Sequence, residues 1–133
     1  MSLYLELLKR CVSNTIYNDD TDMMRGEFVE RDGKVVSSKG SAADLEKKYM
    51  GGIWPSKAHT MIGIPRLENI QFCVEEVLKD GIEGDLLEAG VWRGGASIFM
   101  RGILKENDSD KSVWVCRRKV THSFTAIRTW PCP

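Results

Sequence analysis

Hydrophobic residues recur at helical spacing from the start of the chain. They form one stripe between Ser2, a residue type that caps helix starts, and Asn18. Glu6 and Arg10 stand one turn apart in this segment, where opposite charges support a helix. The pattern therefore predicts an amphipathic helix that ends near Asn18.

Residues 19–52 carry weaker signals. Residues 19–40 are polar, and the ordered element that they favour is a hairpin turning at Asp32-Gly33; a mobile segment is the alternative. A short helix is expected over residues 41–49, because Gly51 and Gly52 then interrupt the pattern.

The longest regular pattern begins at Pro65 and ends at Gly81. Proline is favoured in the first turn of a helix and glycine just after its end. We predict a helix here that packs against the following sheet. If this helix runs antiparallel to the first strand of that sheet, the loop before it, with His59, Thr60 and Met61, lies near the strand's carboxyl end. The alternative is that Met61 fills the core and His59 lies at the surface.

Residues 85–115 change from strand to helix and back. Asp85 to Glu88 have strand character, a glycine-bearing turn from Gly90 to Gly95 follows, and an amphipathic run begins at Ala96. Residues 113–115 form a second short buried strand, which right-handed crossover makes parallel to the first. The fold class is therefore α/β. The apolar residues expected to bury the helix between the strands are Ile98, Phe99, Ile103 and Leu104.

The turn from Gly90 to Gly95 is the candidate binding element. Glycines let the backbone approach a ligand, and the unpaired N–H groups of the following helix point toward whatever is bound. Its spacing, G-x-x-x-G-G, is neither the dinucleotide pattern nor a triphosphate loop. Glu88 closes the strand, where a carboxylate suits the ammonium of a methionine moiety. The same residues also fit an ordinary strand-to-helix connection whose glycines serve turn geometry alone.

Charge is distributed unevenly along the chain. Residues 1–110 hold 14 Lys and Arg against 19 Asp and Glu, whereas residues 111–133 hold 5 cations and no acid. The formal net charge is zero, so the totals favour neither nucleic acid nor a membrane surface as a partner. The basic tail alone makes a modest patch that the acidic body opposes. The 133 residues suffice for one domain but are few for a complete doubly wound enzyme.

The sequence gives little indication of a metal site, a disulfide bond or a membrane-spanning segment. The four cysteines are scattered, without a C-x-x-C pair or a histidine at zinc spacing. Asp19, Asp20 and Asp22 are typical of a solvated polar loop. No apolar run reaches membrane-spanning length, and the N-terminus lacks a signal-peptide pattern. We expect no metal site, reduced thiols and a cytoplasmic location.

Two motifs together resemble the macrocin O-methyltransferase (TylF-like) family of S-adenosylmethionine-dependent sugar O-methyltransferases. They are WPSKAHTMIGIPRLENIQ, and DLLEAGVWRGGASIFMRGIL followed by VWV. The resemblance covers about residues 1–115. It implies the doubly wound, Rossmann-like fold of class I methyltransferases, of which this chain would hold N-terminal helices and the first two parallel strands.

The resemblance also implies cofactor-binding residues and a substrate class. Thr60 and Met61 fall on a loop that touches S-adenosylmethionine. The acceptor would be a small-molecule sugar, its hydroxyl belonging to a natural product or a polysaccharide, and full-length members also use magnesium. Their metal ligands and catalytic base lie mostly downstream, so no catalytic residue is assigned in this chain. The turn that would hold the cofactor comprises Glu88, Ala89, Gly90, Val91, Trp92, Gly94 and Gly95.

The chain departs from the family pattern after Cys116. In the family the second strand continues into Asp-Ser-Phe, and in nucleoside-binding folds an acidic residue at this place accepts hydrogen bonds from the ribose hydroxyls. Here Arg117, Arg118 and Lys119 follow. We expect a truncated product or an interrupted coding frame, with an unrelated tail. The divisions are then an N-terminal helical or lid region, 1–53, the first half of a cofactor-binding domain, 54–116, and a basic tail, 117–133.

Two functions from different classes follow. The first is a methyltransferase-family polypeptide that is incomplete or inactive in this form. Its affinity for S-adenosylmethionine would be weak or absent, because ribose hydroxyls stay unpaired and the basic triplet repels the sulfonium. The second is a non-catalytic interaction module that forms homo-oligomers through exposed sheet edges.

Overall fold

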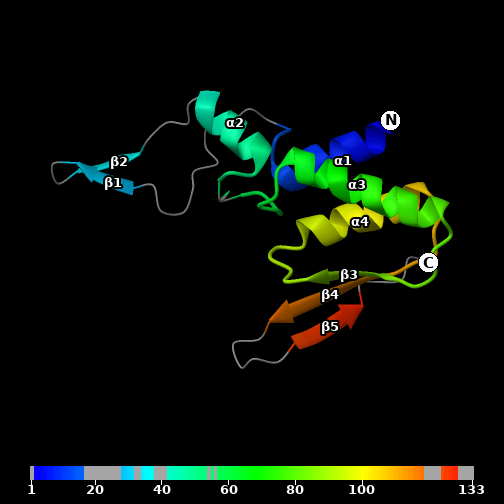
Figure 1. Cartoon of the computed structure of the whole chain (residues 1–133). Coiled ribbons are helices and arrows are strands. Elements are labelled where there is room, and N and C mark those ends of the chain that lie inside the picture. Colours follow the sequence, from blue (N-terminus) through cyan, green and yellow to red (C-terminus); the bar gives the residue numbers. More distant parts are fainter. Residues whose placement is uncertain are drawn as a thin grey trace.

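The computed structural model of the chain describes residues 2–16, 28–31, 34–37, 42–53, 55, 57–118 and 124–128. Residues 28–31, 34–37, 42–44, 117–118 and 124–128 are described by their backbone alone. Figure 1 shows helices α1, α3 and α4 gathered over one face of the larger sheet, and the hairpin β1–β2 lying apart from them. The elements in order are α1 (Leu3–Ser13), β1 (Phe28–Arg31), β2 (Lys34–Ser37), α2 (Ala42–Met50), α3 (Ile64–Lys79), β3 (Leu86–Ala89), α4 (Gly95–Glu106), β4 (Val113–Arg118) and β5 (Phe124–Arg128).

The central unit is β3–α4–β4, with the two strands parallel. Leu86 lies opposite Val113, and the register continues to Ala89 opposite Cys116. The predicted parallel pair is therefore confirmed. No strand was predicted after residue 115, yet β4 continues to Arg118 and β5 pairs antiparallel with it. The β5 sequence, FTAIR, is rich in the aromatic and β-branched residues that favour strands.

Helix α1 begins at its predicted cap and ends before its predicted end. The side chain of Ser2 accepts a hydrogen bond from the Leu5 N–H at 3.4 Å. Asn14 takes a left-handed conformation, φ 53°, and stops the helix four residues before Asn18. Glu6 forms its ion pair with Lys9, at 2.6 Å, and not with Arg10 as expected.

The other helix boundaries follow the glycine and proline signals. Helix α3 begins after Gly63 with Pro65 in its first turn, and Gly81, φ 64°, follows its end. Helix α2 ends before Gly51, which also has a positive φ. The two strands of the predicted hairpin are present as β1 and β2, and its turn residues 32–33 lie outside the described residues.

The core lies between the helices and one face of the sheet. Helix α3 packs on α1, α2 and α4, whereas α4 is the helix that contacts β4 (Figure 1). The prediction that α3 packs on the sheet thus missed its main partners, because periodicity identifies an apolar stripe and not what covers it. The buried apolar residues that form this core are Leu5, Val12, Ile64, Leu67, Val74, Phe99, Ile103, Leu104 and Val113.

Two apolar side chains mark surfaces that this core leaves open. Ile98, which was expected to be buried, is 45% exposed on α4 and lines a groove described below. Leu87 on β3 is 63% exposed, whereas its neighbour Leu86 packs against the core. Because successive strand residues point to opposite faces, one face of β3 is covered and the other is bare among the described residues. No described helix is both long and apolar enough to cross a membrane.

Candidate functional site

The turn between β3 and α4 contains two glycines in the left-handed region. Gly90 has φ 88° and Gly94, which precedes the first residue of α4, has φ 81°. Other residues adopt such angles only at a cost. A Cβ added at either glycine would meet no atom within 4 Å. Open space therefore lies beside the backbone at both positions.

Gly95, the first residue of α4, is constrained by packing. Its N–H donates to the carbonyl oxygen of His59 at 2.9 Å. A Cβ at Gly95 would lie 2.6 Å from that carbonyl and 2.7 Å from the Cβ of Thr60. The Arg93 guanidinium adds a hydrogen bond to the Ala58 carbonyl at 3.0 Å. The loop before α3 is thus attached to the glycine turn, as the antiparallel arrangement of α3 and β3 predicted.

The side chains of this loop are placed differently from one another. Thr60 is 7% exposed, and its hydroxyl oxygen accepts a hydrogen bond from the Ile62 N–H at 3.3 Å within the same loop. Met61 is half-buried and His59 is exposed. Backbone N–H groups of His59 and Thr60 donate to the Val12 carbonyl, so the end of α1 also holds the loop.

Glu88 at the end of β3 is oriented by a residue that the sequence did not single out. The buried Ser97 hydroxyl, in the first turn of α4, donates to Glu88 Oε2. Glu88 Oε1 makes no hydrogen bond with a described residue. A hydroxyl residue in the first turn of the helix that follows a strand-end carboxylate is the signal that would have identified Ser97.

The end of β4 meets the same turn through its backbone. The Cys116 carbonyl accepts hydrogen bonds from the N–H groups of Gly90, at 2.9 Å, and Val91, at 3.4 Å. These turn donors are therefore occupied by the sheet. In α4 the first intrahelical bond runs from Ile98 to Gly94, so the N–H groups of Ala96 and Ser97 precede it. They are the helix-start donors that a ligand beside Gly94 would meet.

A groove of about 690 Å³ opens from the turn and follows α4 between α1 and β4. Val91, Trp92 and Gly94, of the predicted site residues, line it, whereas Thr60, Met61, Glu88, Ala89, Gly90 and Gly95 do not. The Arg93 guanidinium lies 4.2 Å from the Trp92 ring centroid, a cation–π distance. The other residues that line the groove are Tyr4, Leu8, Arg93, Ser97, Ile98, Arg101, Gly102, Lys105 and Val115.

Acidic and metal-binding groups are sparse around this turn. Among the residues that the structure describes, no three His, Cys, Asp or Glu side chains gather to hold a metal ion. Cys11, Cys73 and Cys116 are free thiols. The turn itself presents a carboxylate, helix-start N–H groups and open glycine positions. The carboxylate suits a cationic part of a small polar ligand, and the N–H groups suit a negatively charged or polar part.

Comparison with solved structures defines the class of protein. The chain is similar to the O-methyltransferase NovP, with a TM-score of 0.66 and 45% sequence identity over 85% of this chain and 40% of NovP. The fold is thus that of part of an O-methyltransferase. The sequence pattern of the macrocin-O-methyltransferase (TylF) family matches residues 1–127, and the chain belongs to that family. The match extends beyond residues 1–115, which carry the resemblance by motif.

Relatives with assigned activities show the same partial coverage. Mycinamicin III 3''-O-methyltransferase of Micromonospora griseorubida is 49% identical over 120 residues, and demethyldecarbamoylnovobiocin O-methyltransferase of Streptomyces niveus is 48% identical over 115. A third, 8-demethyl-8-(2,3-dimethoxy-alpha-L-rhamnosyl)-tetracenomycin-C 4'-O-methyltransferase of Streptomyces olivaceus, is 45% identical over 117. Matches cover 85 to 86% of this chain and 39 to 41% of each relative. The chain spans about two fifths of their length.

Proposed function

We propose that this chain carries the donor-binding part of a sugar O-methyltransferase site and binds S-adenosylmethionine at the end of β3. The observation that carries the proposal is the Glu88 carboxylate at the strand end, bonded to Ser97, together with a turn in which the Cβ positions of Gly90 and Gly94 are open. Family membership supplies the chemistry, because a bound S-adenosylmethionine provides an electrophilic methyl group on a sulfonium. The acceptor class is a sugar hydroxyl of a small natural product, as in the rhamnosyl-bearing substrate that the name of the Streptomyces olivaceus relative gives.

The residues around the turn divide the binding work by charge. Glu88 has one carboxylate oxygen held by Ser97 and the other available for the ammonium of the methionine part. The Ala96 and Ser97 N–H groups, at the positive end of α4, suit its carboxylate. Because Gly90 and Gly94 have no side chain, the ligand can approach the backbone of the turn. The loop with Thr60 and Met61 holds the turn in place.

Affinity for the donor is expected to be weak. Ribose hydroxyls in this type of fold are held by a carboxylate at the end of the second strand. Here Arg117 follows Cys116, and its backbone pairs with Thr125 of β5. A lost hydrogen bond to a charged group costs about 1.5–3 kcal/mol. We therefore propose binding in the range of about 0.1–1 mM, without turnover by this chain alone.

Calorimetric titration with S-adenosylmethionine and its demethylated product tests this proposal. Glu88→Ala should weaken binding at least about tenfold, since a charge-assisted bond is lost. Glu83→Ala, which removes an exposed carboxylate before β3, is the matched control and should bind like the parent chain. The neutral product should bind more tightly than the sulfonium if the basic residues repel the latter. Heats that do not saturate, or equal losses in both variants, would overturn the proposal.

A second candidate function is a homo-oligomeric interaction module. The observation that favours it is the exposure of Leu87 on β3, the outer strand of the described sheet. Exposed strands of this kind pair with a further chain unless they are covered. Leu87→Lys should then convert an oligomer to a monomer in analytical ultracentrifugation. Phe72→Lys, which changes an equally exposed apolar residue on α3, should leave the oligomer intact. A parent chain that sediments as a monomer at all concentrations would exclude this function.

A further inference from the structure

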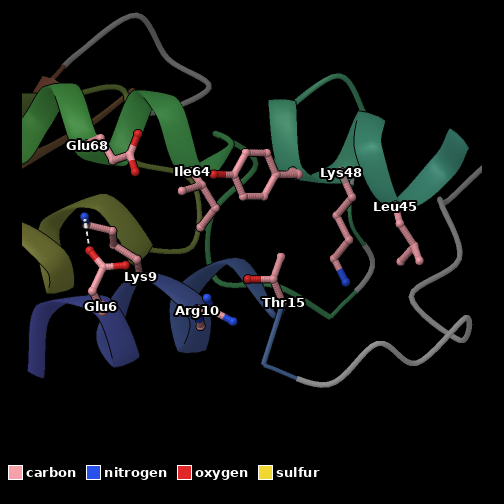
Figure 2. A pocket seen from close by; sticks show the side chains of 9 residues that line it. Glu6, Lys9, Arg10, Thr15, Leu45, Lys48, Ile64 and Glu68 are labelled. Carbon is pink, nitrogen blue, oxygen red and sulfur yellow. Dashed lines mark hydrogen bonds and ion pairs between the residues drawn. The ribbon is translucent and has the colours of Figure 1, made fainter. Parts of the chain in front are cut away.

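A second cavity lies between α1, α2 and the start of α3, away from the glycine turn (Figure 2). Its volume is about 320 Å³, and it shares no lining residue with the groove along α4. Five of its nine lining residues carry a charge. They are Glu6, Lys9, Arg10, Lys48 and Glu68, and the others are Thr15, Leu45, Tyr49 and Ile64.

Lys9 is the residue that distinguishes this cavity from an ordinary surface hollow. Its side chain is only 2% exposed, although burial of an ammonium is costly unless its charge and hydrogen bonds are satisfied. Its Nζ is 2.6 Å from Glu6 Oε1 and 6.0 Å from the Phe99 ring centroid, the limit of a cation–π contact. An ammonium has three N–H donors. The described residues therefore supply an acceptor for one of them, and the others need acceptors within the cavity.

The charges around the cavity are mixed. Figure 2 shows the Lys9–Glu6 pair with the Glu68 carboxylate above it, whereas Lys48 reaches in from α2. Lys48 Nζ donates to the Asn14 carbonyl at 2.7 Å. With Arg10, three cations face two carboxylates. A charged ligand of either sign would meet like charges here, which costs free energy in a partly buried site.

Hydroxyl groups match such a mixed set, because each one both donates and accepts a hydrogen bond. Hydroxyl oxygens can accept from the Lys9 ammonium while hydroxyl protons are donated to Glu6 and Glu68. Apolar surface from Leu45 and Ile64 faces the same space and can cover the C–H face of a ring. The volume is at the lower end of the range for ligand pockets and suits one ring.

We propose that this cavity binds a neutral polyhydroxylated ligand of monosaccharide size. Lys9 and Glu6 hold one edge of the ring through adjacent hydroxyls, and Glu68 accepts from a further hydroxyl. The site is separate from the donor-binding turn and from the groove along α4. It does not depend on the proposed function, since none of its residues belongs to the turn or the groove.

Saturation-transfer NMR and calorimetry with glucose, glucuronate and cyclohexanol test the proposal on the full chain. Glucose should saturate with a Kd of about 1–10 mM, and cyclohexanol, which has a single hydroxyl, should bind at least about tenfold more weakly. Lys9→Met should reduce glucose affinity at least about tenfold. Lys79→Met is the matched control, because Lys79 forms the same i, i+3 pair with Glu76 on the exposed surface of α3 and should leave affinity unchanged.

Glu68→Gln keeps the test decisive if Lys9→Met fails to fold. Glu68 is exposed, so replacing its carboxylate by the amide of glutamine should leave the stability of the chain unchanged while glucose affinity falls several-fold. Tighter binding of glucuronate than of glucose would overturn the proposal in favour of an anion site. Glucose titrations that do not saturate by about 50 mM would overturn it, as would equal affinity in the parent, Lys9→Met and Glu68→Gln chains.

Discussion

The carboxyl ends of β3 and β4 lie side by side, yet they are built differently. At the end of β3 a carboxylate, two left-handed glycines and the loop from His59 form a turn held by several hydrogen bonds. At the end of β4 the chain runs on as a strand, pairing Arg117 and Arg118 with β5. Beyond the parallel pairing of the strands, the Cys116 carbonyl joins the two ends by accepting hydrogen bonds from the N–H groups of Gly90 and Val91.

This difference separates the geometry of a binding turn from its completion as a site. The β3 end keeps its shape through local contacts with α4 and the loop before α3, which the chain itself contains. A ribose site needs a carboxylate from the neighbouring strand, and the residues after Cys116 are cations. Substitutions can break the first end or repair the second, and they can separate backbone strain from ligand contact.

The largest effect is expected from Gly95→Ala, which breaks the β3 end. A Cβ at this position would press on the His59 carbonyl and on Thr60, where backbone atoms cannot yield easily. We expect the free energy of unfolding to fall by about 3 kcal/mol, with a melting temperature lower by roughly 10 °C. Thermal unfolding followed by circular dichroism measures this loss.

Gly102→Ala on the same helix is the matched control for that change. Its new Cβ would meet the end of the flexible Leu8 side chain, which can move, and alanine is favoured over glycine inside a helix. Its stability should stay within about 1 kcal/mol of the parent. Equal losses in the two variants would show that the loop before α3 does not clasp the turn.

The next effect is a gain, from Arg117→Asp at the β4 end. The substitution places a carboxylate directly after Cys116, which pairs with Ala89 just before the turn, where nucleoside-binding folds of this type have their acidic residue. Binding of S-adenosylmethionine should strengthen by about 2 kcal/mol, roughly thirtyfold in Kd, through charge-assisted bonds to ribose hydroxyls. Calorimetric titration measures this change.

Arg118→Asp makes the same change in charge one residue further along β4. It should improve donor binding only slightly, because it removes a repulsive charge without supplying the hydroxyl acceptor. If both variants gain equally, the gain is due to net charge, and the β4 end is not the ribose site.

The positions of individual helices and strands were predictable from the sequence, whereas which of these elements pack against each other was not. The strand, turn and helix of residues 86–106 follow from periodicity and glycines, so they were predicted to within a residue or two. The burial of Lys9 was not, because a search for apolar stripes does not consider a lysine whose charge is paired. The exposure of Ile98 depends on which elements cover α4, and a linear pattern carries no such information.

The candidate site shows the same division. Glu88 and the glycines were identified from their place at a strand end, and proximity of the loop before α3 followed from one assumption about helix direction. The sequence pattern could not show that Gly90 and Val91 donate to Cys116, since this depends on the register between β3 and β4. Ser97 was missed for a related reason, because its contact with Glu88 spans the turn.

The smallest effect separates two reasons for a glycine in the turn. Gly90 and Gly81 both have a positive φ, and a Cβ at either meets no atom within 4 Å. Alanine should therefore cost about 1 kcal/mol of unfolding free energy at each position through backbone strain. Only Gly90→Ala should also weaken S-adenosylmethionine binding, several-fold, because its methyl group occupies open space at the turn that the proposed ligand requires. Equal stability losses with unchanged donor binding in both variants would mean that Gly90 serves turn geometry alone, and that the open space beside it is not a binding surface.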